Sequence, residues 1–206
     1  MTDIDVPQIY LITPAHFDLA AFSSSLTAVL DSTEIACVRL ALATQDEDDV
    51  ARAADALREI THARDIALVV SDHVLLAERL GLDGVHLNDG SKSVRAARKA
   101  LGADAIVGSF CHASQHDGMS AGEAGADYVS FGPVSASALG DGTAAPDDLF
   151  QWWSEVIELP VVAEGGLDAA RIAALAPYTD FFGIGDELWR TEDPAATLSA
   201  LRAAMG

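Results

Sequence analysis

The stretch Gly125-Ala126-Asp127-Tyr128-Val129-Ser130-Phe131-Gly132-Pro133-Val134 decides how the rest of this sequence is interpreted. Residues 128–131 carry bulky side chains between a Gly-Ala-Asp turn and a Gly-Pro stop, which predicts a short buried strand. The loop that follows, residues 135–146, is rich in small and acidic residues. Because long loops at the carboxyl ends of strands commonly bind substrates, we expect a substrate loop or lid here, with a surface loop without a role as the alternative.

Outward from this strand, strand-like and helix-like segments alternate along the whole chain. The expected strands are residues 9–12, 35–40, 66–70, 84–87, 105–109, 128–131, 161–163 and 181–184. The expected helices are residues 18–30, 46–63, 73–80, 93–101, 114–124, 147–157, 168–175 and 194–204. Eight such units with mostly short connections indicate a closed parallel (β/α)8 TIM barrel, and we expect a single domain over residues 1–206. A doubly wound open sheet is the alternative, but no Gly-x-Gly-x-x-Gly motif follows the first strand.

Composition excludes several classes of protein. The chain has 32 acidic and 12 basic residues and a formal charge of −20, so its surface repels polyanions and nucleic-acid binding is not expected. No apolar run is long enough to span a bilayer, and the acidic amino terminus lacks a secretory pattern. Cys37 and Cys111 lie far apart beside apolar strands, which favours free thiols in a reducing compartment. We therefore expect a cytoplasmic protein.

Candidate site residues are sought after the strands, where TIM barrels place their chemistry. Asp72 and Asp89 follow neighbouring strands, so their carboxylates could share a Mg²⁺ that bridges to a pyrophosphate. For either aspartate alone, a helix cap is an equal alternative. Gly165, Gly166 and Gly185 follow the last two strands, where backbone amides often bind a phosphate, although tight turns also use glycine.

Several ordered motifs resemble those of the thiamine phosphate synthase family. They are Tyr10-Leu11-Ile12-Thr13, Ser71-Asp72, Gly84-Val85-His86-Leu87, Val107-Gly108-Ser109-Phe110-Cys111-His112, the stretch quoted above, and Pro160-Val161-Val162-Ala163-Glu164-Gly165-Gly166-Leu167. Together they cover nearly the whole chain. The resemblance implies an enzyme that joins an aminopyrimidine methyl pyrophosphate to a thiazole phosphate, with Mg²⁺ as cofactor and pyrophosphate leaving before the thiazole nitrogen attacks.

The matched positions imply roles for particular residues. Asp72 and Asp89 would hold Mg²⁺, Ser137 would close over the substrate from the lid, and Gly165 and Gly166 would meet the thiazole phosphate. Further substrate contacts are expected from Arg39, Ser71, Ser109 and Gly185.

The sequence departs from the family pattern where positive charge is expected. Arg39, Ala41 and Ala43 stand in place of a Gln-x-Arg-x-Lys pattern, Gly140 in place of the lid lysine, and Asp186 in place of a serine at the second phosphate site. Charge-assisted hydrogen bonds to the pyrophosphate are therefore missing, each worth roughly 1.5–3 kcal/mol. We expect thiamine phosphate to form very slowly or not at all.

Substitute charges are few. Lys92 or Arg95 could reach in from the loop after residues 84–87. Arg39 should point into the barrel, where a buried charge needs a partner, and we expect Glu164 within about 6 Å of it.

Two rival functions stay open. A sister branch of the family, the thiazole tautomerases, uses a histidine after the fifth strand, so His112 could serve as an acid or base. A metal shared by His112 and His116 is a weaker idea, because residues 114–117 are typical of a helix start. The second rival is a non-catalytic barrel that binds a small ligand or a partner protein. For the enzyme we expect a phosphorylated small-molecule substrate as the partner, with a homodimer left open.

Overall fold

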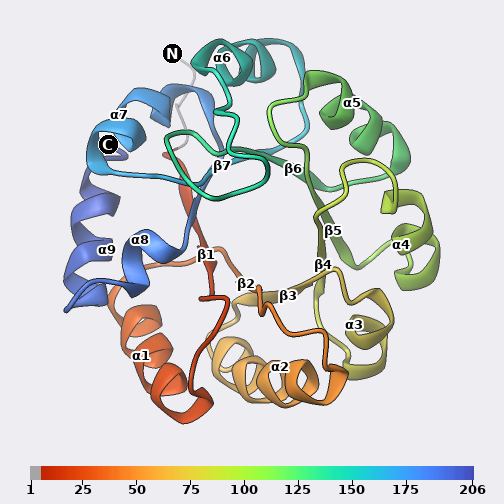
Figure 1. Cartoon of the computed structure of the whole chain (residues 1–206), viewed down its shortest axis with the longest axis vertical. Coiled ribbons are helices and arrows are strands. Elements are labelled where there is room, and N and C mark those ends of the chain that lie inside the picture. Colours follow the sequence, from red (N-terminus) through yellow and green to blue (C-terminus); the bar gives the residue numbers. More distant parts are fainter. Residues whose placement is uncertain (1–5) are drawn as a thin grey trace.

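Eight parallel strands form a closed barrel, as the alternating pattern predicts. The structure is a computed structural model that describes residues 6–206. The strands are β1 (Gln8–Ile12), β2 (Cys37–Leu40), β3 (Ala67–Ser71), β4 (Gly84–Leu87), β5 (Ile106–Phe110), β6 (Tyr128–Phe131), β7 (Val161–Glu164) and β8 (Phe181–Ile184). Each strand pairs in parallel with its neighbour in sequence, and β8 closes on β1 (Figure 1). The (β/α)8 TIM barrel is confirmed, and the open sheet is excluded.

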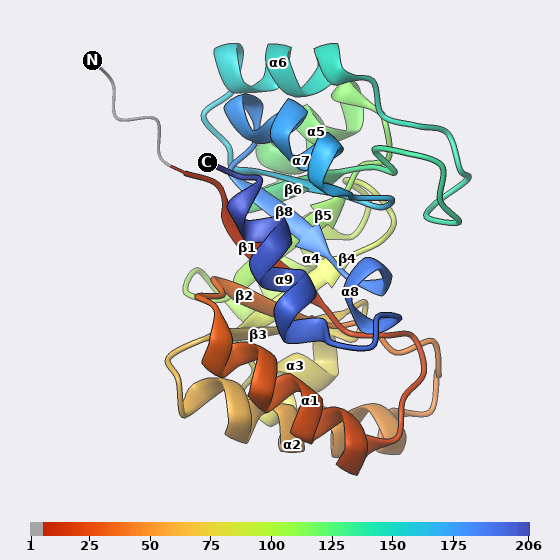
Figure 2. The ribbon, with the colours of Figure 1, turned by 90° about the vertical axis from the view of Figure 1, so that its left-hand side faces the viewer.

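Helices surround the barrel and cover its outer face (Figures 1 and 2). They are α1 (Leu19–Ser32), α2 (Glu47–His62), α3 (Val74–Leu80), α4 (Val94–Leu101), α5 (Gln115–Ala124), α6 (Asp147–Val156), α7 (Ala169–Leu175), the 3₁₀ turn Ala176–Tyr178, α8 (Asp186–Trp189) and α9 (Pro194–Ala203). Several begin at a residue whose side chain accepts a hydrogen bond from a backbone N–H of the first turn, namely Asp18, Asp46, Ser114, Asp168 and Asp193. Part of the large acidic content therefore serves to fix where helices start.

The observed elements differ from the sequence-based expectation in their boundaries, which shift by a residue or two at several places, and in one additional α-helix. The second strand begins at Cys37 and not at residue 35, so the preceding apolar residues belong to the approach to the strand. The four-residue helix α8 was not predicted, because one turn is too short to show a periodic apolar pattern. This short helix proves to matter for the site.

The core has two separate apolar layers. A large cluster lies between the outward-facing strand residues and the helices. A smaller cluster, which includes Tyr10, Cys37, Val69, Tyr128 and Val162, fills the inside of the barrel. Successive strand residues point alternately inward and outward, so each strand contributes to both layers. This inner cluster fills the barrel below the carboxyl ends of the strands, so any cavity must lie above it.

The loops at the carboxyl ends of the strands lie on one side of the molecule, where the segment between β6 and α6 projects furthest (Figure 2). No helix within residues 6–206 is long and apolar enough to cross a membrane.

Candidate active site

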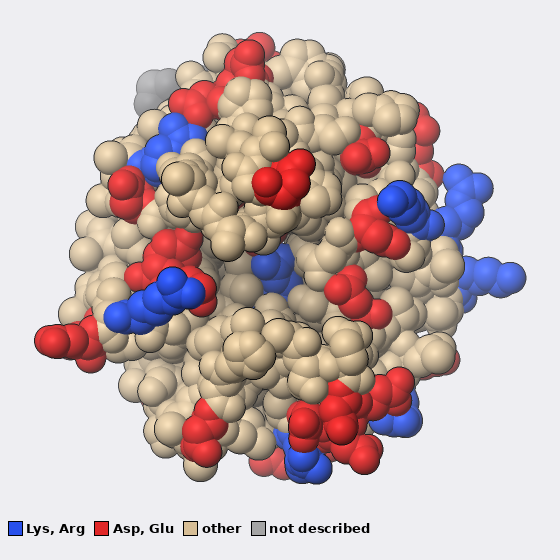
Figure 3. Space-filling model, in the orientation of Figure 1, with Lys and Arg blue, Asp and Glu red and all other residues tan. Residues whose placement is uncertain are grey.

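A cavity of about 420 Å³ opens at the carboxyl ends of the strands. In Figure 3 it is the hollow at the centre of the face, with basic atoms visible inside it. Its polar and charged lining comes from the carboxyl ends of β2, β3 and β7, from the loops after β1, β2, β3 and β4, from α8 and from the lid. These residues are Thr13, Arg39, Gln45, Ser71, Asp72, His73, Asn88, Ser137, Glu164, Asp186 and Glu187. The expected position of the site is thereby matched by a real opening.

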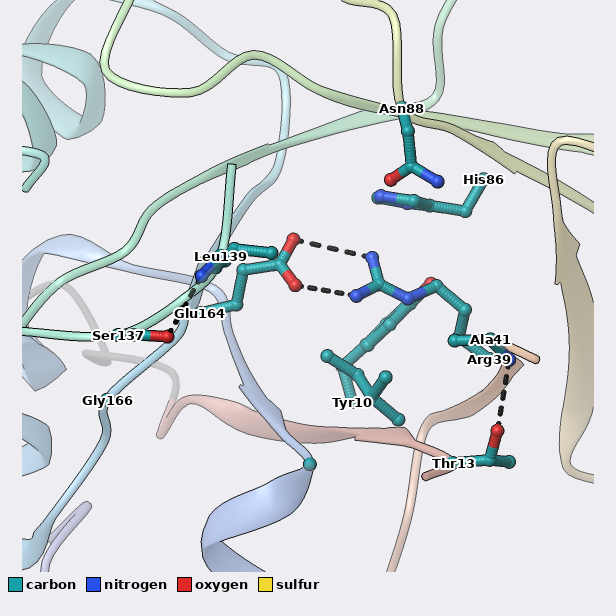
Figure 4. A network of polar contacts seen from close by, with 12 residues as sticks. Tyr10, Thr13, Arg39, Ala41, His86, Asn88, Ser137, Leu139, Glu164 and Gly166 are labelled. Atoms are coloured by element: carbon teal, nitrogen blue, oxygen red, sulfur yellow. Dashed lines mark hydrogen bonds and ion pairs between the residues drawn. The ribbon is translucent and has the colours of Figure 1, made fainter. Parts of the chain in front are cut away.

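An ion pair between Arg39 and Glu164 forms the wall of this cavity. Arg39 Nη2 lies 2.6 Å from Glu164 Oε2, and Nη1 lies 3.3 Å from Oε1, a two-pronged contact across the barrel (Figure 4). The exposed fractions are 5% for Arg39 and 1% for Glu164. The expected pairing is confirmed. Burial alone would lower the pKa of Arg39, but the Glu164 carboxylate outweighs it, so the pKa is raised and the guanidinium stays charged.

A hydrogen-bonded chain of three rings lies beside the ion pair inside the barrel. His86 Nδ1 is 2.9 Å from the Tyr128 hydroxyl, which is 2.6 Å from the Tyr10 hydroxyl. Burial and the nearby Arg39 charge hold the pKa of His86 well below its usual value, so the imidazole is neutral. Burial raises the pKa of both tyrosines, whose hydroxyls keep their protons. Among residues 6–206, the charges in this part of the interior are therefore those of Arg39 and Glu164.

Asp72 stands at the rim of the cavity in a conformation that few non-glycine residues adopt. Its φ is +62°, and its carboxylate oxygens accept hydrogen bonds from the backbone N–H (2.9 Å) and the side-chain Nδ2 (2.7 Å) of Asn88. Such backbone strain is often found at functional positions. Asn88 thereby holds the Asp72 carboxylate in place at the cavity.

The donor set at Asp72 suits Mg²⁺ shared with a substrate. Carboxylate and amide oxygens are hard ligands, and Mg²⁺ usually takes one or two carboxylates together with waters and phosphates. Within the described residues, no three His, Cys, Asp or Glu side chains gather as a metal site. Asp72 and Asn88 therefore fit a Mg²⁺ that takes its remaining ligands from water and from phosphate oxygens.

Some of the predicted site residues lie outside the cavity lining. Asp89 accepts a hydrogen bond from the Ser93 hydroxyl at 2.6 Å, just before α4. The Ser109 hydroxyl is buried and donates to the carbonyl of Gly90 at 2.7 Å. The substrate and metal roles of Asp89 and Ser109 stay predictions. Lys92 and Arg95 are exposed and do not line the cavity, so they do not replace the missing charges.

His112 lies beneath the lid and outside the cavity lining. Its ring packs against Phe110, with centroids 4.5 Å apart, and a Cβ added to Gly140 would come within 2.8 Å of Nδ1. The φ of His112 is +55°. His112 therefore supports the lid loop through contact with Gly140.

The lid residue Ser137 lines the cavity, as expected for a residue that closes over a substrate. Its hydroxyl accepts a hydrogen bond from the Leu139 N–H at 3.2 Å (Figure 4). The Leu139 side chain lies so close to Gly165 that an added Cβ there would be 2.8 Å from it. The lid is thus in contact with the glycine turn after β7.

The glycine turns after β7 and β8 hold an unexpected partner, the side chain of Glu187. Its Oε1 accepts hydrogen bonds from the N–H groups of Gly166 (2.8 Å) and Leu167 (3.0 Å), and its Oε2 accepts one from Gly185 (3.0 Å). Sequence reasoning missed Glu187. The sequence signal that could have indicated Glu187 is an acidic residue two positions after Gly185, just past the last strand.

The charges around the cavity are mostly negative. Among the described residues that line it, Arg39 is the one arginine or lysine and His73 the one histidine, against the four acids Asp72, Glu164, Asp186 and Glu187. Asp186 is exposed and pairs with Arg190 at the surface. An anionic ligand therefore meets net repulsion unless cations accompany it.

Fold and site together define a TIM-barrel protein with a small-molecule site under a lid at the carboxyl ends of its strands. The family model of thiamine monophosphate synthase matches residues 9–180. The chain is 40% identical to the thiamine-phosphate synthase of Rhodospirillum centenum over 97% of this chain and 96% of the relative. It is 37% identical to that of Erythrobacter litoralis, with 95% of each covered. The chain belongs to the thiamine monophosphate synthase family.

A solved structure shares this fold. The structure of a thiamine phosphate pyrophosphorylase from Pyrococcus furiosus superposes with a TM-score of 0.84 at 20% identity, covering 98% of this chain and 96% of the other.

Proposed function

We propose that this protein joins an aminopyrimidine, supplied as its methyl pyrophosphate, to a thiazole, with release of pyrophosphate. The observation that carries the proposal is Asp72, fixed by Asn88 at the rim of a lidded barrel cavity in a member of this family. Family membership supplies the reaction class, and the cavity supplies a place for it. We place the protein in the cytoplasm, where its two buried cysteines remain free thiols.

Three of the lining residues have a proposed task. Mg²⁺, when bound, would neutralise charge on the pyrophosphate. Asp72 would hold this Mg²⁺ at the rim of the cavity. Ser137, with the rest of the lid, excludes water from the reacting atoms of the two substrates. The Arg39 guanidinium is committed to Glu164, so it contributes one fixed positive charge but few free donors. Leaving-group stabilisation from this chain's own side chains is therefore weak.

The tautomerase alternative is not favoured, because His112 would have to face the cavity and does not line it. A non-catalytic binding barrel is the outcome that remains if no coupling is found.

Turnover of both precursors tests the proposal. With hydroxymethylpyrimidine pyrophosphate, thiazole phosphate and Mg²⁺, we expect pyrophosphate release that depends on both substrates, at least a hundredfold below a rate of about 1 per second. The Asp72→Asn variant should lower this rate further, whereas Asp104→Asn, at an exposed position away from the cavity, should not. A rate of about 1 per second or more would show that the missing cations are unnecessary. Complete absence of coupling, with thiazole phosphate and with the thiazole alcohol, would reject the proposed function.

A further inference from the structure

The loops after β7 and β8 form a cradle for an anion, and the chain fills that cradle itself. Three backbone N–H groups, from Gly166, Leu167 and Gly185, converge on the carboxylate of Glu187 at 2.8–3.0 Å. Convergent backbone amides at this place in a TIM barrel are suited to a phosphate. Here the same donors are already satisfied by a half-buried side chain of the protein.

A phosphate group could enter this cradle only by displacing Glu187. The displaced carboxylate would then lie beside the incoming dianion, since α8 is a single turn directly after Gly185. Asp186 lines the same cavity and adds a second negative charge, partly offset by its surface pairing with Arg190. Both the loss of three charge-assisted hydrogen bonds and like-charge repulsion therefore oppose a phosphate here.

An uncharged hydroxyl meets none of these obstacles. A carboxylate oxygen has lone pairs beyond those that accept the backbone N–H groups, so Glu187 can accept a hydrogen bond from an alcohol without leaving the cradle. The four acids of the cavity outnumber its single arginine, and this excess of negative charge also favours a product that carries a positive charge.

We infer that Glu187 sets the specificity of the acceptor side of the cavity, and that the acceptor is a thiazole bearing a free hydroxyethyl group in place of its phosphate ester. This inference rests on the proposed function. In the coupling step, the bond between the pyrimidine methylene carbon and the pyrophosphate oxygen breaks, and its electron pair leaves with pyrophosphate. The ring-nitrogen lone pair of the thiazole forms the new C–N bond. The products are pyrophosphate and a thiazolium alcohol, so no phosphate remains on the acceptor end.

Binding measured by titration calorimetry tests the specificity with two probes, hydroxyethylthiazole and its phosphate ester. The wild-type protein should bind the alcohol at least about tenfold more tightly than the ester, and Glu187→Ala should gain about tenfold to a hundredfold in affinity for the ester, the size expected for one or two charge-assisted hydrogen bonds. Glu192→Ala is the matched control, since it removes an exposed carboxylate from the segment after α8 and should leave both affinities unchanged. Equal binding of the two probes by the wild-type protein, or no gain in Glu187→Ala, would overturn the inference.

A second measurement needs neither thiazole nor turnover. Inorganic phosphate should raise the unfolding temperature of Glu187→Ala, whose amides are free, and leave that of the wild-type protein unchanged. Glu187→Gln keeps an acceptor oxygen in the cradle and should respond less than Glu187→Ala, which guards against an effect of misfolding. If phosphate raises the unfolding temperature of Glu187→Ala alone, the result supports a cradle that Glu187 fills in the wild-type protein, even if no coupling reaction is ever detected. The proposed function and this inference can therefore be rejected independently. Equal stabilisation of wild type and variant by phosphate would contradict the inference.

Discussion

The Arg39–Glu164 pair occupies a part of the barrel where each charge depends on the other. Both side chains are nearly inaccessible to water, and two short contacts join them. Removing one partner of a buried pair leaves an uncompensated charge, which is far more costly than losing the pair as a whole. The family pattern has glutamine at the position of Arg39, and an apolar residue in place of Glu164 completes a neutral pair of similar size for comparison.

The first prediction compares single and double substitutions of this pair. Arg39→Gln and Glu164→Ile should each lower the free energy of unfolding by about 3–5 kcal/mol, whereas the double variant should lie within about 1.5 kcal/mol of wild type. Urea unfolding of the four proteins gives the coupling energy directly. If the losses of unfolding free energy in the two single variants simply add in the double variant, the two charges do not depend on each other.

The second prediction concerns the neutral histidine beneath the ion pair. The pKa of His86 is lowered by burial and by Arg39, so the unfolded chain binds a proton that the folded chain does not. Stability should therefore fall as the pH drops below the unfolded value of about 6.5, by up to about 1.4 kcal/mol per pH unit for this one group.

Unfolding free energies measured from pH 7.5 to pH 5 in wild type and His86→Gln check this slope. The slope should be reduced in His86→Gln and kept in His16→Gln, which removes an exposed histidine. The lowered pKa values of Asp31 and Asp147 act in the same direction, but below about pH 4, outside this window. An identical slope in wild type and His86→Gln would show that His86 is not held neutral.

Individual residues differed in how well the sequence revealed their roles. The Arg39–Glu164 pair could be predicted because alternation places both side chains inside the barrel and a buried charge demands a partner. The place of Asp72 at the cavity could also be predicted, from its position after a strand, whereas its metal role stays a prediction. Glu187 could not be found in this way, because its partners are backbone N–H groups, which carry no mark in the sequence.

Among the elements, β5 and β6 show how closely two strands constrain each other. A Cβ added to Gly108 on β5 would lie 2.0 Å from Cζ of Tyr128 and 2.3 Å from its hydroxyl oxygen. Glycine at this position therefore makes room for the ring that joins His86 and Tyr10. The hydrogen-bonded chain inside the barrel depends on this absence of a side chain.

The third prediction follows from this close approach. Gly108→Ala should lower the free energy of unfolding by about 3 kcal/mol, because the buried Tyr128 ring can move away only by giving up its hydrogen bonds to Tyr10 and His86. Gly122→Ala on α5 is the matched control. Its new Cβ would meet only the end of the Leu159 side chain at 3.0 Å, and alanine favours a helix by about 1 kcal/mol. Urea unfolding of both variants measures the two free energies of unfolding. A Gly108→Ala variant as stable as the wild-type protein would refute the packing argument.

The long elements were predictable and the short ones were not. Helices such as α2 have caps and an apolar face that appear in the sequence, whereas α8 is one turn fixed by tertiary contacts. The Trp189 indole N–H donates to the carbonyl of Ile12 at 2.6 Å, a contact between the last and first units of the barrel. Such a contact is invisible until the barrel is closed.

At the scale of the whole molecule, closure of the barrel brings together residues from opposite ends of the chain. The cavity is lined by residues from Ile12 to Glu187, and the charge inside it repeats the excess of acids outside. Figure 3 shows acidic side chains distributed over the visible face, with basic ones often beside them. The fold class followed from counting strand–helix units, but the sign of the cavity's charge depended on which acids point inward.

Glu187 can also be described as a ligand that the protein carries with it. A tethered group meets its binding partners at an effective concentration set by the tether, which is in the millimolar range for short flexible links. The four-residue helix that bears Glu187 is a shorter and stiffer link than those. A dissolved anion must therefore compete with the tethered Glu187 carboxylate, which cannot diffuse away. Raising the concentration of the anion should displace this carboxylate only weakly. Selectivity against anions at this end of the barrel is thereby built into one covalent attachment.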